Sequence, residues 1–144
     1  MRDAAKFARY ILDYTCSRAE VGMTTDELDQ IAHAEIIRHK VYPSPLNYSS
    51  FPKSICTSIN EVTCHGIPDS RKLCNGDILS VDVSVFMNGY HGDNCKTVIV
   101  GEGDESAVRL VRVSEEALLE AIKICGPGVY VFSARSFLIK CLGV

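Results

Sequence analysis

Two aspartates stand on either side of an Asn88-Gly89 pair in the segment "DILSVDVSVFMNGYHGDNCKTVIV". Asn-Gly between alternating apolar and polar residues is the strongest short-range signal for a β-hairpin with a two-residue turn. Counting outward from that turn pairs Met87 with Tyr90 and then Ser84 with Asp93. The same count puts Asp82 diagonally across from Asp93 on one face, with backbones roughly 7–8 Å apart.

Carboxylates on one face of a hairpin repel each other unless a positive partner neutralises them, and aspartate is depleted in strands. Divalent ions take carboxylate oxygens, and two ions roughly 3.5–4 Å apart can hold a water nucleophile and polarise a carbonyl. The pair Asp82 and Asp93 therefore predicts metal-assisted hydrolysis. A second interpretation stays open from the hairpin alone, in which both carboxylates face solvent and are hydrated.

His65 is the first candidate for a further functional side chain, because Gly66 and Pro68 predict a rigid bend that holds its imidazole in place. His91 shares the predicted face of Asp93, so it competes for a role as a ligand.

A possible apolar wall comes from Tyr48, Phe51 and Cys56, which bracket a proline-rich segment. Their apolar and polarisable side chains suit an unbranched thioether. Ordinary packing of a loop on a core explains them equally well.

Helices are predicted before and after this region. Apolar residues at helical spacing favour a helix over residues 3–18, and the Thr24/Glu27 capping box starts a second helix that runs to about His39. His33 and His39 are expected to be surface residues of that second helix. A third apolar face runs from Val108 to Cys125 and is stopped by "GPG".

Between the helices, the prolines and small polar residues of 41–53 favour a turn-rich loop. Short strands are predicted near 54–59 and 61–64, followed by the hairpin over 77–100. Helices packed on an antiparallel sheet predict the α+β class.

The composition narrows the functional classes. A chain of 144 residues accommodates one core, and its net charge of −3, without a basic and aromatic block, argues against a nucleic-acid partner. It shows neither a membrane-spanning run of roughly 20 apolar residues nor a signal peptide. Seven cysteines without a C-x-x-C pair indicate reduced thiols inside a cell.

Two blocks, "NYSSFPKSICTSINEVTCHGIPDSRKL" and "GDILSVDVSVFMNGYHGD", resemble the type 1 methionine aminopeptidases of the peptidase M24 family. The likeness extends over roughly residues 3–128, and the "YPSPLNY" loop is most similar to the organellar branch. It implies the first half of the pita-bread (creatinase/aminopeptidase) fold, whose metal site lies between two pseudo-symmetric halves. Residues 1–128 are expected to form this half and 129–144 a divergent or truncated tail.

The resemblance also implies roles for individual residues. Asp82 would bind one of two divalent ions (Co, Mn, Fe or Zn) and Asp93 would bridge both, while His65 would hydrogen-bond the substrate or its tetrahedral intermediate. Tyr48, Phe51 and Cys56 match the lining of the methionine pocket.

The family's remaining ligands, one histidine and two glutamates of which one is the general base, belong to the second half. No histidine follows His91, so residues 94–144 offer no counterpart for that imidazole. The chain is therefore expected to be a poorly active form.

A methionine aminopeptidase removes the initiator methionine from nascent polypeptides when the second residue is small, and the ribosome is a further candidate partner. The expected compartment is the cytoplasm, with a mitochondrion or another organelle as the alternative. The rival function is a non-catalytic, pita-bread-related protein-binding module. Such modules usually lose the metal carboxylates, whereas this chain retains Asp82 and Asp93.

Overall fold

The structure, a computed structural model, describes residues 1–130. The chain divides into two compact units, Met1–Gly103 and Asp104–Val144. The elements of the first unit are α1 (Arg2–Cys16), α2 (Thr25–Arg38), β1 (Tyr42–Pro43), the 3-10 turn η1 (Tyr48–Ser50), β2 (Cys56–Ile59), β3 (Ile78–Met87) and β4 (Tyr90–Ile99). The described part of the second unit contains α3 (Glu105–Lys123).

Both N-terminal helices form where the sequence predicts them. α1 buries Ala8, Ile11 and Leu12 along one face. α2 begins at the predicted capping box: the Thr24 hydroxyl accepts a hydrogen bond from the Glu27 amide at 3.1 Å, and the Glu27 carboxylate accepts one from the Thr24 amide at 2.7 Å. These reciprocal bonds satisfy amides that the first helical turn leaves without partners.

The sheet is built around β3, which pairs with β4 along one edge and with both β1 and β2 along the other, all antiparallel. The predicted hairpin register is confirmed, since Met87 lies opposite Tyr90 and Ser84 opposite Asp93. Asn88 and Gly89 have φ values of 52° and 84°. Both are left-handed, as a type I′ turn requires.

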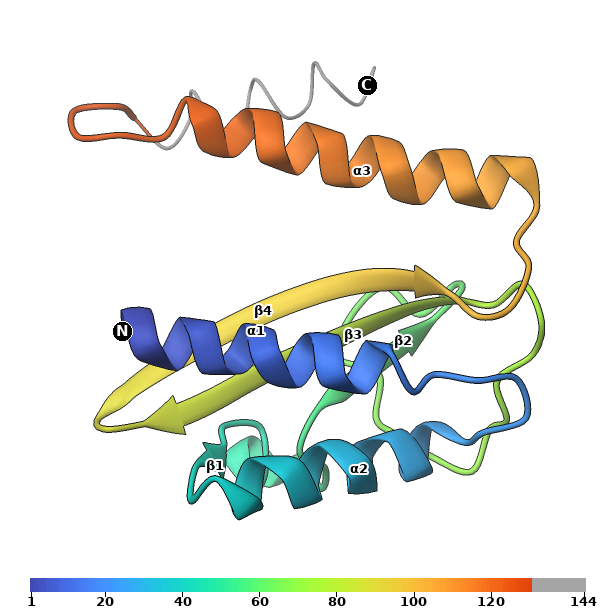
Figure 1. Cartoon of the computed structure of the whole chain (residues 1–144), viewed down its shortest axis with the longest axis horizontal. Coiled ribbons are helices and arrows are strands. Elements are labelled where there is room, and N and C mark those ends of the chain that lie inside the picture. The colour runs from blue at the N-terminus through green and yellow to red at the C-terminus, as the bar shows by residue number, and fades with distance from the viewer. Residues whose placement is uncertain (131–144) are drawn as a thin grey trace. The chain divides into compact units, whose positions relative to one another are not determined.

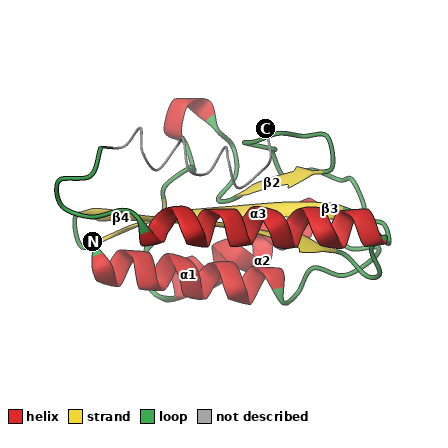
Figure 2. Cartoon of the chain, turned by 90° about the horizontal axis from the view of Figure 1, so that it is seen from above, coloured by secondary structure: helices red, strands yellow, loops and turns green. Residues whose placement is uncertain are grey.

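The two faces of β3 differ in their surroundings. Its alternate residues on one side are fully buried in the main apolar cluster, which also contains residues of α1 and α2: Leu79, Val81, Val83 and Val85. Figure 2 shows α1 and α2 on the same side of the hairpin strands. The residues between them, Ser80, Asp82 and Ser84, point to the opposite side and are only half-buried.

A glycine lets α1 lie close to β4, which it accompanies along much of its length (Figure 1). A Cβ atom on Gly92 would lie 2.2 Å from the carbonyl oxygen of Ala4. The Asn94 side-chain amide also donates to the Ala5 carbonyl, at 3.1 Å. This contact fixes the helix on the strand that carries Asp93.

The predicted strand over 61–64 is wrong. After β2 the chain turns at Asn60, which has a left-handed φ of 52°, and the Val62 amide donates to the Ile59 carbonyl at 3.0 Å. The Asn60 side chain bonds the Ile78 amide and the Asp77 carboxylate, both at 2.9 Å. These bonds hold the chain in a turn, and residues 61–64 have no strand partner in the described structure.

In the second unit, the predicted third helix is confirmed. The Asp104 carboxylate caps α3 by accepting from the Ala107 amide at 2.8 Å, and the helix ends before Gly126. None of the described helices combines the length and apolar character needed to cross a membrane. From residue 131 onward, the predicted tail over 129–144 lies outside the described residues.

Candidate metal and substrate site

Six residues predicted from the sequence to form the site line a single cleft of about 650 Å³ within the first unit, and the competing candidate His91 lines it too. The six are Tyr48, Phe51, Cys56, His65, Asp82 and Asp93. They come from the loop around η1, from the start of β2, from the loop after it and from the open face of the hairpin. The fold thus brings together residues that are up to 45 positions apart (48 to 93).

The two aspartates interact across the hairpin. Burial, the charge of Asp93 and a hydrogen bond with it raise the pKa of Asp82 well above its ordinary value, with a smaller opposing effect of His65. Asp93 is held by the Ser84 hydroxyl, which donates to its Oδ1 at 2.8 Å. The two carboxylates therefore repel each other as like charges do, with Asp82 half-buried and Asp93 exposed.

The carboxylate oxygens of Asp82 and Asp93 are of a type that suits a divalent cation. Among the described residues that line the cleft there is no lysine or arginine, so the basic side chains beside Asp82 and Asp93 there are the imidazoles of His65 and His91. Carboxylate oxygens are preferred ligands of hard divalent ions. Residues 1–130 place no group of three or more His, Cys, Asp or Glu side chains where they could hold an ion. Within the described residues, Asp82 and Asp93 are therefore too few to complete a metal site by themselves.

His65 lies at the cleft in a left-handed conformation with φ 54°. The neighbouring Gly66 packs on the edge of β2, where an added Cβ would lie 2.1 Å from the Thr57 carbonyl oxygen. Gly66 also accepts from the Thr57 amide at 2.9 Å and donates to the Ser58 hydroxyl at 3.1 Å. The predicted bend is held by this strand edge, and no other residue type fits so close an approach.

The apolar wall has an exposed part and a buried part. Tyr48 is 75% exposed, whereas Cys56 is 7% exposed and lies directly opposite Asp82 in the sheet. Burial, helped by the charges of Asp82 and Asp93, raises the pKa of the Cys56 thiol to about 11. The sulfur at this position is therefore neutral at physiological pH and offers a polarisable apolar surface.

Other residues join the cleft. His91, expected as a competing ligand, lines it beside Phe86, and its Nδ1 lies 2.9 Å from the Ser44 hydroxyl. Sequence reasoning gave no role to Ser44 or Ser84. The hairpin count offered a signal for Ser84, because it pairs this residue with Asp93. Nothing local in the sequence points to Ser44, which reaches His91 from another loop.

The chain belongs to metallopeptidase family M24, whose model matches residues 1–135. It is 52% identical over 128 residues to a mitochondrial methionine aminopeptidase 1D of Danio rerio, covering 89% of this chain and 38% of that protein. It is also 53% identical over 129 residues to a chloroplastic and mitochondrial methionine aminopeptidase 1D of Arabidopsis thaliana, covering 90% of this chain and 37% of that protein.

Among solved structures, the methionine aminopeptidase of Rickettsia prowazekii matches with a TM-score of 0.96 and 37% identity, over 99% of this chain and 57% of that one. The predicted fold class is confirmed: α-helices on an antiparallel sheet, as in one half of the pita-bread fold. The chain spans less than two thirds of the length of each of these relatives.

Proposed function

We propose that this chain supplies the N-terminal half of a metal-dependent methionine aminopeptidase, which removes the initiator methionine from nascent proteins by hydrolysis. One observation carries the proposal: a repelling carboxylate pair, Asp82 and Asp93, shares a cleft with an apolar wall. The pair suits metal ions and the wall suits a thioether side chain. About half of the aligned residues are identical to those of methionine aminopeptidases, and this supports the substrate class.

Two divalent ions are proposed, and Asp82 and Asp93 would hold them. When bound, such ions supply a water nucleophile at neutral pH and polarise the scissile carbonyl. Oxygen ligands alone are compatible with Mn, Fe, Co or Zn. Ser84 keeps the Asp93 carboxylate in place through its hydrogen bond.

The remaining cleft residues are proposed to bind the substrate. Cys56 and Phe51 pack against the methionine side chain, and Tyr48 closes the pocket from its exposed position. His65, fixed by the contact of Gly66 with β2, hydrogen-bonds the substrate or its tetrahedral intermediate. An imidazole at such a position stabilises charge that develops on the scissile group.

The 144 residues by themselves are proposed to have little or no peptidase activity. Two carboxylates leave the ions under-coordinated, and the absence of the general base alone removes a factor of roughly 10²–10⁴. We propose that residues 1–128 form the aminopeptidase half and 129–144 a divergent tail. The retained carboxylates favour this role over a binding module that has lost metal chemistry.

The partners proposed are nascent polypeptides whose N-terminal methionine precedes a small residue, and the ribosome that presents them. The names of the two relatives compared above favour the organellar alternative over the cytoplasm expected from the sequence. An organellar enzyme would act on proteins made or imported there.

The test combines metal titration and peptide hydrolysis. Calorimetry with Mn²⁺ and with Co²⁺ compares the chain with an Asp82→Asn/Asp93→Asn variant and with a matched Asp3→Asn/Asp13→Asn variant, whose changes lie on α1. Binding that only the first variant loses supports the proposed site, whereas equal binding by all three contradicts it. Release of methionine from a Met-Ala-Ser peptide by the isolated chain would contradict the predicted inactivity.

A further inference from the structure

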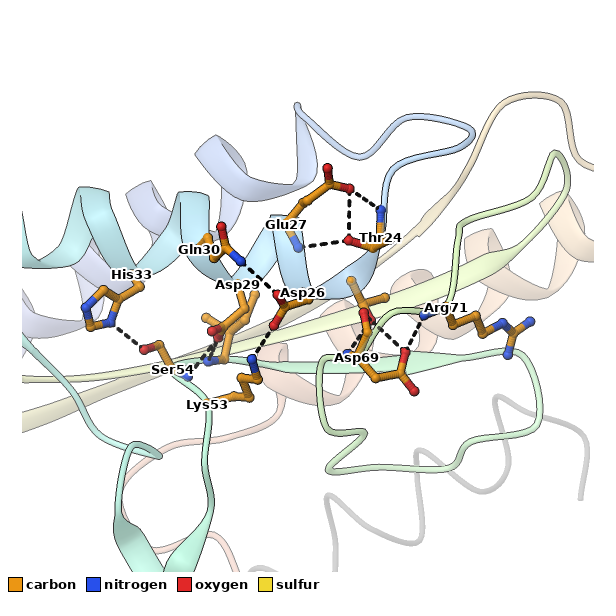
Figure 3. A network of polar contacts seen from close by, with 12 residues as sticks. Thr24, Asp26, Glu27, Asp29, Gln30, His33, Lys53, Ser54, Asp69 and Arg71 are labelled. Carbon is orange, nitrogen blue, oxygen red and sulfur yellow. Dashed lines mark hydrogen bonds and ion pairs between the residues drawn. The ribbon is translucent and has the colours of Figure 1, made fainter.

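Three side chains along one stripe of α2 hold three consecutive residues of the loop that precedes β2, as Figure 3 shows. The pairs are Asp26 with Lys53, Asp29 with Ser54 and Ile55, and His33 with Ser54. His33, expected to be a plain surface residue, is therefore half-buried, with its Nδ1 2.7 Å from the Ser54 hydroxyl.

Asp29 is the central contact of this stripe. One of its oxygens, Oδ1, accepts from the Ser54 amide at 2.7 Å and from the Ile55 amide at 3.0 Å. The residue is only 6% exposed, and burial raises the pKa of its carboxyl despite these two bonds. Burying a carboxylate costs free energy, and the hydrogen bonds from the Ser54 and Ile55 amides offset part of that cost.

The two bonds lie immediately before a wall of the cleft. Ile55 is followed by Cys56, which opens β2 and lies opposite Asp82. On the other side of Ser54, Phe51 and Pro52 line the same cleft. Asp29 therefore holds the backbone at the point where the wall of the cleft enters β2.

The start of α2 also holds the opposite loop. The Thr25 hydroxyl accepts from the Asp69 amide at 2.9 Å, and the Asp26 amide donates to the Asp69 carbonyl at 2.9 Å. Asp69 follows His65 and Ile67, which line the cleft from that side. One helix, remote from the reacting groups, thus contacts both loops that border the site.

We infer that Asp29 is a positioning residue: through the amides of Ser54 and Ile55 it sets the place of the wall from Phe51 to Cys56 relative to Asp82. It thereby fixes the width of the pocket that receives the methionine side chain. This second statement rests on the proposed function, whereas the first does not. Asp29 is not among the described residues that line the cleft, and it acts through the backbone amides that it binds.

The test uses the reactivity of Cys56, whose sulfur is a reporter inside the wall. Iodoacetamide labelling of the whole chain, followed by peptide mass spectrometry, measures the labelling rate of Cys56 against that of exposed Cys64. In Asp29→Ala the wall loses a buried acceptor, and Cys56 is expected to react roughly tenfold faster. Cys64 labelling should not change.

Two further variants separate positioning from general destabilisation. Asp29→Asn retains an Oδ1 acceptor for both amides, so its Cys56 labelling should stay close to that of the unaltered chain. Thr24→Ala weakens the same helix through its cap without touching Ser54 or Ile55. At a loss of thermal stability equal to that of Asp29→Ala, its Cys56 should still be labelled slowly. Hydrogen exchange of the Ser54 and Ile55 amides should accelerate in Asp29→Ala alone.

The inference is overturned if Thr24→Ala exposes Cys56 as much as Asp29→Ala does, or if Asp29→Asn behaves like Asp29→Ala. The pocket assignment is read out separately, by adding L-methionine to the unaltered chain. Protection of Cys56 by methionine supports the proposed pocket. If methionine gives no protection while the variants follow the expected order, the positioning role stands and the pocket assignment fails.

Discussion

The two faces of β3 show how one strand divides its residues between stability and chemistry. On one face Leu79 and Val83 are fully buried in the apolar cluster that includes residues of α1 and α2. On the other face Asp82 meets the like charge of Asp93 in a half-buried cleft. Burial of apolar surface on the first face stabilises the fold, whereas the like charges on the second face oppose it.

Two carboxylates, one on α2 and one on β3, show a related contrast. Glu35 on α2 is 6% exposed, and Arg38, with help from Tyr10, lowers its pKa to about 2. Asp82 in the cleft has its pKa raised, because burial and Asp93 both disfavour its charge. Glu35 has an arginine as its partner, whereas Asp82 has a like charge beside it, which is the arrangement expected if a cation binds there.

The largest effect is expected from Leu79→Ala on the buried face. Removing this side chain should lower the free energy of unfolding by about 2–5 kcal/mol, because the packed surroundings cannot fill the cavity. Urea denaturation followed by circular dichroism measures the loss. The neighbouring Ser80→Ala removes only a hydroxyl bond to Thr97 on the other face, so it should cost less than about 1.5 kcal/mol. Equal losses would remove the distinction between the faces.

On the cleft face, Asp82→Asn should separate binding from stability. Calorimetry should show a large fall in Mn²⁺ affinity. Loss of a residue that only supports a ligand lowers affinity roughly 10–100-fold, and loss of a direct ligand should lower it by more. With a chelator present, the variant should unfold at the same or a higher urea concentration, because repulsion with Asp93 is removed. A clear destabilisation of the metal-free variant would show that Asp82 supports the fold.

A smaller, pH-dependent effect is expected from Glu35→Gln. The folded pKa of Glu35, about 2, lies below its unfolded value near 4.3, so its charge stabilises the fold above that value. This contribution is lost as the pH falls toward 2. The variant should therefore be less stable than the unaltered chain at pH 7, and urea midpoints should converge between about pH 5 and pH 2. A difference in urea midpoint that does not change with pH would contradict the low pKa of Glu35.

Local sequence signals predicted most of the elements. The capping box at Thr24, the Asn88-Gly89 turn and the apolar spacing of α1 and α3 each specify their element within a few residues. The strand expected over 61–64 failed because Asn60 bonds Ile78 and Asp77, which belong to a later part of the chain. A pattern of side chains along four residues carries no information about such a partner.

The sequence by itself determined that Asp82 and Asp93 share a face, because a two-residue turn fixes the register of every pair that follows it. Only the tertiary structure decided which groups meet that face. Cys56 reaches the cleft at the start of β2, after a segment that Asp29 of α2 holds, and His65 reaches it on a loop that the close approach of Gly66 to β2 fixes. Such contacts join residues far apart in the chain, so they form only when helices, loops and sheet are packed together.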